Sequence, residues 1–191
     1  MKKKDKYQNP GRTIKEMLFN VTEKFPANNA FKIKNRGKIE PISFMQLTKD
    51  VQTLGAELYS LGLSGKRVGI IGENSYPWVS VFLSVVCGGG TAVPFDKGFT
   101  SEELATCIKR SSIEALFYDG KYSQVVHRAA EIAGYGEKAS EVTLFKMTGE
   151  SNVIDQMKLS GELKIKTGNA EDINTEISED DPAVILVTAG T

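Results

Sequence analysis

The sequence has no excess of either charge and no long apolar run. Its 191 residues include 24 Lys and Arg against 24 Asp and Glu, so the net charge is zero. Nucleic-acid and membrane-surface modules usually carry a basic excess, so we expect neither kind of partner. No apolar run reaches the ~20 residues of a transmembrane helix, and the start is too polar for a signal peptide. These absences predict a cytoplasmic globular protein.

Cysteine and histidine are also scarce, since Cys87, Cys107 and His127 are the only ones. The cysteines lie in apolar or helical surroundings without metal-ligand spacing, so we expect reduced, buried thiols rather than a disulfide or a metal site. His127 falls within a predicted helix with no nucleophile partner, so we expect a surface or boundary residue. Asp119 and residues 180–181 match turn chemistry better than a metal site.

The first third of the chain predicts a helix, a hairpin and a second helix. Residues 13–26 begin with the capping-box pattern TIKE and end at a proline. Residues 30–42 alternate apolar and polar side chains around an Arg-Gly turn, which is typical of an antiparallel hairpin. Residues 43–62 begin with a second capping-box pattern, SFMQ, and stop at a glycine.

From residue 67 onward, short apolar strands alternate with helices. The predicted strands are 67–71, 91–95, 114–118 and 142–147, and the predicted helices are 76–87, 101–111 and 122–132. This alternation implies βαβ crossovers and a parallel sheet that is buried on both faces. Residues 148–177 are polar and weakly periodic, and their pattern allows only a short helix over 153–159. The sequence therefore predicts an α/β fold, a mostly parallel sheet flanked by helices, with a small N-terminal helix and an antiparallel hairpin.

Two glycine-containing segments follow these elements. Residues 68–75 (VGIIGENS) join a strand to a helix, but they hold two glycines three apart and no G-x-G-x-x-G. A turn relaxed at Gly72 and capped by Asn74 or Ser75 is favoured over a nicotinamide site. Residues 87–96 (CGGGTAVPFD) allow a left-handed helix cap and close packing of helix on sheet, which favours a structural role over direct substrate contact.

The chain ends on a feature that predicts function. Residues 183–187 predict a buried strand, which runs directly into Thr188, Ala189, Gly190 and Thr191. Glycine lets a backbone approach an anion closely, and backbone N–H groups and hydroxyls can then point at it. Spacing alone leaves a phosphate loop undecided, because the G-x-x-x-x-G-K-[ST] pattern of a Walker loop does not fit before the chain stops.

Taken together, five segments resemble the adenylate-forming superfamily of AMP-binding acyl-CoA synthetases. Residues 42–47 (ISFMQL) are similar to its hydrophobic-[ST]-[YF]-x-E-L segment, and residues 61–70 (LGLSGKRVGI) to G-x-x-x-G-D-R-V-A-I. Residues 73–78 match E-N-S-x-x-[WF], and residues 87–96 resemble G-A-x-x-V-P-[LY]-[DN]. Residues 179–191 match the D-D-x-A-x-I-x-Y-T-S-G-T lead-in of its phosphate loop. The E-N-S-x-x-W wording favours the long-chain fatty acid branch.

The sequence departs from these patterns at several positions. Gln46 replaces a common Glu, Lys66 an Asp and Gly69 an Ala. Val187 stands where Tyr is usual. Ala189 stands where Ser is usual, which removes one hydroxyl from a loop that would hold ATP phosphates. We expect this last change to weaken phosphate contact without abolishing it.

The resemblance implies an activity for a longer protein. Family members activate a carboxylate with MgATP to an acyl-adenylate and then transfer the acyl group to coenzyme A. The implied cofactors are thus ATP, Mg²⁺ and coenzyme A, and the implied substrate is a carboxylic acid, here a fatty acid. Only Thr188, Ala189, Gly190 and Thr191 correspond to a functional motif, as the start of the phosphate loop. No catalytic or metal-binding residue of the family corresponds to a position in this chain.

We therefore expect residues 1–12 to be a flexible basic tail, and residues 13–191 to be the N-terminal portion of an AMP-binding domain truncated inside its phosphate loop. The 191-residue chain is expected to fold without catalysing the reaction. The alternative is a non-catalytic α/β module that binds a nucleotide or a protein partner. A dehydrogenase half is a weaker alternative because G-x-G-x-x-G is missing.

Overall fold

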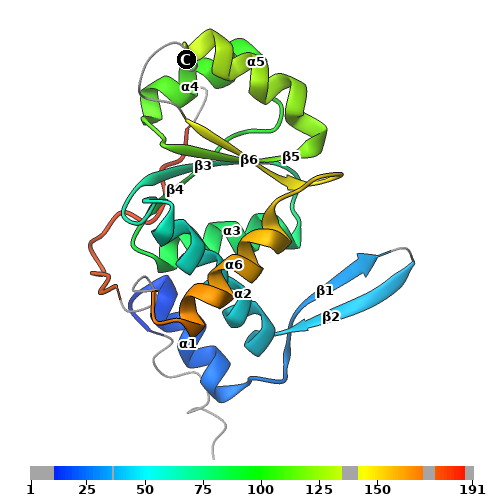
Figure 1. The fold of residues 1–191 in the computed structure, drawn as a ribbon, viewed down its shortest axis with the longest axis vertical. Helices are drawn as coiled ribbons and strands as arrows, with labels where there is room; N and C mark the ends of the chain where they lie inside the picture. The colour runs from blue at the N-terminus through cyan, green and yellow to red at the C-terminus, as the bar shows by residue number, and fades with distance from the viewer. Residues whose placement is uncertain (1–10, 36, 135–141, 170–174, 188–191) are drawn as a thin grey trace, which may run out of the picture.

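A computed structural model describes residues 11–35, 37–134, 142–169 and 175–187 (Figure 1). Its elements follow one another as α1 (Ile14–Lys24), β1 (Asn29–Asn35), β2 (Lys38–Ser43), α2 (Phe44–Ser60), β3 (Arg67–Ile71), α3 (Tyr76–Cys87), β4 (Thr91–Pro94), α4 (Ser101–Ser111), β5 (Ala115–Asp119), η2 (Gly120–Tyr122), α5 (Ser123–Ala133), β6 (Thr143–Thr148) and α6 (Ile154–Lys166). The predicted α/β class is confirmed, and the predicted bounds of β3, α3 and α4 match those of the structure.

The antiparallel hairpin stands apart from the main sheet. β1 and β2 pair only with each other in the described structure, in the register Lys32↔Pro41 and Ile33↔Glu40. Figure 1 shows this two-stranded ribbon projecting away from the helices. The first four residues of β2 are exposed. The body of the fold therefore holds the hairpin at its base and leaves its far end in solvent.

The main sheet is parallel, with the strand order β4-β3-β5-β6. Residues 183–185 extend it beyond β4, because Ala92 donates its N–H to the carbonyl of Ala183 and Ile185 donates to the carbonyl of Ala92. The bridge from Ala92 to Val184 is parallel. The sheet thus grows outward from β3 in both directions.

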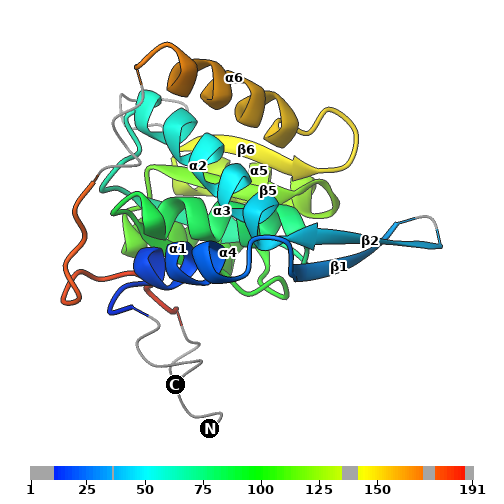
Figure 2. The ribbon, with the colours of Figure 1, turned by 90° about the horizontal axis from the view of Figure 1, so that it is seen from below.

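Helices cover both faces of the sheet (Figures 1 and 2). On one face, alternate strand residues such as Val68, Ile70 and Phe117 pack with α1, α2, α3 and α6. On the other face, Leu116 and neighbouring strand residues pack with α4 and α5. This alternation is the two-sided burial expected of a parallel sheet whose crossovers are helices.

Capping explains where several helices begin. Thr13 and Ser43 accept the predicted bonds from the N–H groups of Glu16 and Gln46. The reciprocal half of each box is absent: the Glu16 carboxylate accepts from Arg12 N–H instead, and Gln46 donates to Asp50. A complete capping box instead joins Thr100 and Glu103 at the start of α4, where it was not predicted.

Two predictions need correction. The helix expected over 153–159 extends to Lys166, because Gly161 lets α6 lie against the backbone of α2 and the packing outweighs a weakly periodic sequence. The buried strand expected over 183–187 is reduced to an isolated bridge at Val184 and is not buried. It lies at the outer edge of the described sheet, so Leu186 is 72% exposed and Val184 37% exposed, while Ile185 packs against the core.

Candidate functional site

The carboxyl edge of the sheet is the candidate site. The crossover after β3 uses α3 on one face, whereas the crossovers through α4 and α5 use the other face. The connections therefore diverge between β3 and β5, and open α/β sheets bind ligands at such a switch point, outside the carboxyl ends of the strands. Four polar residues that sequence analysis did not select gather here, namely Glu73, Lys97, Lys121 and Tyr122.

Asp119 fixes this edge from inside the protein. It ends β5 and is only 4% exposed. Its Oδ2 accepts the backbone N–H of Glu73 at 2.7 Å, and its Oδ1 accepts the hydroxyl of Thr148 at 2.7 Å. One carboxylate therefore ties together the ends of β3, β5 and β6. The position of Asp119 at a strand end predicted turn chemistry, and no local pattern indicates these partners, which lie 46 and 29 residues away in the sequence.

Glycines make room for this carboxylate. A Cβ on Gly72 would lie 2.8 Å from the carboxyl carbon and Oδ2 of Asp119, and one on Gly120 would lie 2.6 Å from the carbonyl oxygen of Thr148. Neither distance is compatible with a side chain at these positions. Glycine is thus required at position 72 because the Asp119 carboxylate approaches its backbone closely. The sequence pattern predicted this glycine for a different physical reason, namely that it relaxes the backbone of a turn. Ser75 caps α3 through the N–H of Trp78, as predicted.

Glu73 is the centre of the exposed part of the site. Its carboxylate accepts from Lys97 Nζ at 2.5 Å, from Lys121 Nζ at 3.0 Å and from the Tyr122 hydroxyl at 2.7 Å. The donors come from the segment after β4 and from η2 after β5. Three donors that follow β4 and β5 thus converge on one carboxylate that follows β3.

The cations set the electrostatics of the cluster. Hydrogen bonds from Lys97, Tyr122 and Lys121 lower the pKa of Glu73 from 4.5 to about 2. In turn, the hydrogen bond and charge of Glu73 raise the pKa of both lysines. Because the side chain of Glu73 is 41% exposed, water and salt screen these interactions. The edge therefore holds two ammonium groups that can also attract an anion from solution.

The residues of the predicted phosphate loop, Thr188, Ala189, Gly190 and Thr191, lie outside the described residues. The described chain reaches Val187, on a segment that runs parallel to β4. That direction leads the chain toward the same edge of the sheet as Glu73 and Asp119. A signal for the cluster was available in the sequence, since Glu73, Lys97 and Lys121 each follow a predicted strand by two or three residues.

The structure also describes His127 and the two cysteines, which the sequence singled out. His127 is exposed on α5 and its Nε2 lies 3.2 Å from the Tyr118 hydroxyl, as expected for a helix surface. Cys87 is buried, Cys107 is half-buried, and neither forms a disulfide. The described ranges contain no group of three or more His, Cys, Asp or Glu residues that could hold a metal ion. None of their helices is both long and apolar enough to span a bilayer.

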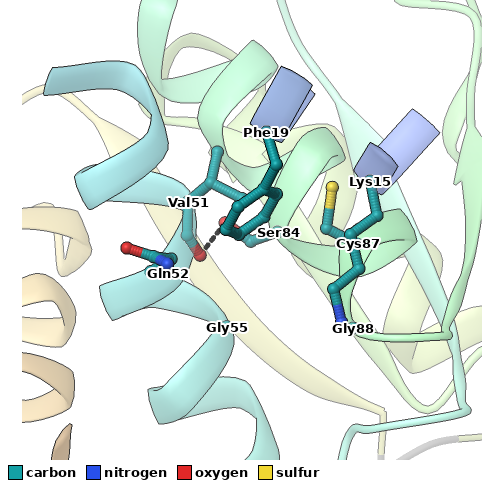
Figure 3. A pocket seen from close by; sticks show the side chains of 8 residues that line it. All are labelled: Lys15, Phe19, Val51, Gln52, Gly55, Ser84, Cys87 and Gly88. Atoms are coloured by element: carbon teal, nitrogen blue, oxygen red, sulfur yellow. Dashed lines mark hydrogen bonds between the residues drawn. The ribbon is translucent and has the colours of Figure 1, made fainter. Parts of the chain in front are cut away.

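A small cavity between α1, α2 and α3 is also excluded as a substrate site. Phe19, Val51, Ser84 and Cys87 are among its lining residues, and the Ser84 hydroxyl donates to the carbonyl of Val51 at 3.2 Å (Figure 3). Its volume is about 20 Å³, which suffices for about one water molecule. This cavity is a packing feature of the three helices.

The fold and this edge define an α/β protein of the class that binds ligands at strand carboxyl ends. The model of the AMP-binding enzyme family matches residues 18–191, and the chain belongs to that family. It is 27% identical over 111 residues to the mitochondrial medium-chain acyl-CoA ligase ACSF2 of Mus musculus, covering 58% of this chain and 18% of that protein. It is 27% identical over 135 residues to a probable CoA ligase, CCL8, of Humulus lupulus, covering 68% and 20%.

Solved structures agree with the fold. The long-chain-fatty-acid-CoA ligase FadD1 of Archaeoglobus fulgidus superposes with a TM-score of 0.74 at 19% identity, covering 94% of this chain and 35% of that one. A fatty acyl-adenylate ligase of L. pneumophila, solved with acyl adenylate and pyrophosphate, gives 0.64 at 15% identity, covering 91% and 27%. The chain spans about a fifth of the two curated relatives named above. The relative from Mus musculus is named as a medium-chain enzyme, so the long-chain branch stays a prediction for this chain.

Proposed function

We propose that this chain is part of an ATP-dependent carboxylate-activating ligase, which forms an acyl-adenylate and then a thioester with coenzyme A. The observation that carries the proposal is the placement of residues 183–185 beside β4 in parallel. It directs the chain toward the edge where Lys97 and Lys121 lie. Membership of the AMP-binding enzyme family supplies the chemistry.

The residues at this edge suit a phosphate-bearing substrate. Lys97 and Lys121 offer ammonium donors, which bind phosphate as point charges. Thr188, Gly190 and Thr191 would add backbone N–H groups and hydroxyls, with Ala189 contributing its N–H alone. ATP, when bound, supplies an electrophilic phosphorus for the carboxylate. The described residues contain no group of three or more His, Cys, Asp or Glu that could hold a metal ion, and we assign Mg²⁺ to none of them.

The first test of the proposal is to sequence the gene beyond codon 191. Reading the sequence past codon 191 should give Thr-Gly-x-Pro-Lys-Gly directly after Thr191. A stop codon at that position would contradict the truncation and favour a non-catalytic module. If the reading frame continues, the longer product should catalyse fatty-acid-dependent exchange of pyrophosphate into ATP.

The 191-residue chain itself should show no such exchange. We expect the positioning of reactants and neutralisation of charge that drive adenylation to need groups that the family resemblance assigns to positions beyond residue 191. An exchange assay with ATP, labelled pyrophosphate and dodecanoate checks this, with the longer product as the positive control. Turnover by the 191-residue chain would refute its inactivity, and submicromolar ATP binding in calorimetry would favour the nucleotide-binding module.

The cellular compartment and the substrate length belong to the same proposal. We keep a cytoplasmic location and a fatty acid substrate as predictions, although the ACSF2 relatives are named as mitochondrial. Fractionation of cells that express a tagged protein tests the location. Comparison of octanoate and hexadecanoate as substrates of the longer product tests the branch.

A further inference from the structure

A groove follows the outer edge of β1. Four consecutive residues of that strand, 31–34, line it, whereas Glu40 is the only lining residue from β2. Consecutive side chains of a strand point to opposite faces, so a groove lined by all four lies along the backbone edge rather than on one face. Residues 74–79, at the start of α3, form the opposite wall, and the volume is about 810 Å³. The groove therefore runs between an edge strand and a helix.

The register of the hairpin turns backbone groups of β1 toward this groove. Antiparallel strands alternate hydrogen-bonded and non-hydrogen-bonded pairs. Pro41 has no N–H to donate, which places its pair with Lys32 among the non-hydrogen-bonded ones. The pair of Lys34 with Ile39, two residues along, is then of the same kind. The N–H and C=O groups of both lysines therefore point away from β2, the only strand that pairs with β1 among the described residues.

The two outer edges of the hairpin differ as templates for a further strand. An edge strand with free backbone donors and acceptors can pair with another chain, and proline is one of the residues that blunt such an edge. β2 carries Pro41 within its six residues, whereas β1, NAFKIKN, has no proline. Strand addition is therefore favoured at β1, on the side that faces the groove.

The two faces of β1 select the side chains of an added strand. On one face, the rings of Phe31 and Tyr76 meet with centroids 5.8 Å apart, and half-buried Ile33 follows. On the other face, Lys32 and Lys34 are exposed, and no ion pair among the described residues includes either one. Apolar contacts and opposite charges are favourable between directly opposed residues of neighbouring strands. The matching strand therefore alternates acidic and apolar residues.

A second copy of this chain does not match the edge. Two β1 strands related by a twofold axis at Ile33 would place Lys32 of each copy directly opposite Lys34 of the other. Like charges in directly opposed positions are destabilising. The lysines thus act against pairing of the edge with itself, while they favour an acidic partner.

We propose that the edge of β1 binds an extended segment of another polypeptide, in which acidic residues alternate with apolar ones, as a third strand of the hairpin. Its acidic side chains lie beside Lys32 and Lys34, and the apolar side chain between them lies beside Ile33, on the side of Trp78. Main-chain hydrogen bonds supply affinity in such strand addition, and alternate side chains supply specificity. The proposal does not depend on adenylation activity.

The probe is an acetylated and amidated peptide of the sequence TEVEVET, titrated into the 191-residue chain. Trp78 is the only tryptophan and lines the groove, so a saturable change in its emission gives the dissociation constant. Amide exchange, followed by NMR, then identifies the edge. At a peptide concentration ten times the dissociation constant, exchange at Lys32 and Lys34 should slow about tenfold. Exchange at Ile39, on the edge of β2, should not change.

The charge assignment is tested by reversal. The peptide TKVKVKT should bind roughly tenfold more weakly than TEVEVET, because two cross-strand charge pairs become repulsive. Lys32→Glu combined with Lys34→Glu should reverse this preference. Lys24→Glu combined with Lys109→Glu makes the same change of net charge at exposed lysines of α1 and α4, and should leave the preference as it is. Circular dichroism verifies that each variant is folded.

Four results would overturn the proposal. The absence of saturable binding would remove the site, and slowed exchange at Ile39 instead of Lys32 and Lys34 would place the strand on the wrong edge. Equal affinity for the two peptides, or no reversal in the Lys32 and Lys34 double variant, would remove the acidic partner. Slow exchange at both lysines in the longer product without peptide would assign the strand to that product. The titration contains no ATP, so its failure is separate from that of the adenylation assay.

Discussion

The two faces of the sheet are built differently. Buried polar side chains concentrate in the helices of one face, where they are Thr48, Asp50, Thr53, Ser80 and Ser84. Among the described residues of α4 and α5, on the other face, only Ser111 is both polar and buried. On that side, Leu104, Ile108 and Val126 pack directly against the strands.

The difference follows from the number of layers. α4 and α5 pack on the sheet in a single layer, and large apolar side chains fill the space. α2 instead lies between α3, α1 and α6, so it packs on helices in several directions (Figure 2). Helices approach closely where side chains are small, and their polar groups then need partners. Ser84 donates to Ser80 and Val51 carbonyls, and Lys158 of α6 pairs with Asp50 at 2.7 Å.

The largest effect on stability should come from the face covered by α4 and α5. Leu104→Ala removes a fully buried side chain from the single layer of α4 and leaves a cavity. We expect the free energy of unfolding to fall by about 3–4 kcal/mol. Urea denaturation measures it, with Leu104→Met, expected to lose less than ~1.5 kcal/mol, as the volume-conserving control. A loss equal to that of Leu104→Met would mean that this face is loosely packed.

A smaller effect on stability, whose sign is informative, should come from the face covered by α1, α2, α3 and α6. Helix propensity alone predicts that Gly161→Ala in α6 stabilises the protein by ~1 kcal/mol. A Cβ at that position would overlap the carbonyl oxygen of Thr53 in α2, so we expect a loss of about 2–3 kcal/mol instead. Ser160→Ala, the neighbouring position on α6, is the control and should change stability little. Stabilisation by Gly161→Ala would show that the two helices do not meet at their backbones.

The smallest effect on stability should come from Glu73, at the carboxyl edge of the sheet. The pKa of Glu73 is lowered to about 2 from 4.5, so its contribution to stability is complete above about pH 4.5 and is lost as the pH falls toward 2. Glu73→Gln lacks that contribution. The stability gap between the native protein and the variant should therefore close over this pH range, and should also shrink in high salt. A gap independent of pH would refute the cation cluster.

The sequence allowed the fold to be predicted well where periodicity and capping are local. β3, α3 and α4 matched because an apolar run, Pro77 near a helix start and flanking turn residues each act within a few positions. α6 was underestimated because Leu159 and Leu163 are exposed and Gly161 interrupts the apolar pattern. Its extent depends on contact with α2, about a hundred residues earlier in the chain.

The candidate site was less predictable for the same reason. Asp119, Gly72 and Thr148 form one unit only after three strands align.

One departure from the family pattern now has a physical basis, since Lys66 pairs with Glu114 at 3.0 Å. Gly69 has another, because a Cβ there would meet the ends of Ile113, Phe95 and Leu116 at 2.7–2.8 Å. The phosphate-loop residues stay a prediction because they lie outside the described residues.

The strand order also has a consequence for synthesis on the ribosome. Among the strands of the main sheet, β3 is made first and is central, and β4 and β5 then add to its two free edges. β6 follows beside β5, and residues 183–185 come last, beside β4. No described strand of this sheet has to insert between two that are already paired. Each newly emerged strand meets an open edge, so the sheet can lengthen in step with translation, and only its current outer strands are exposed to wrong partners.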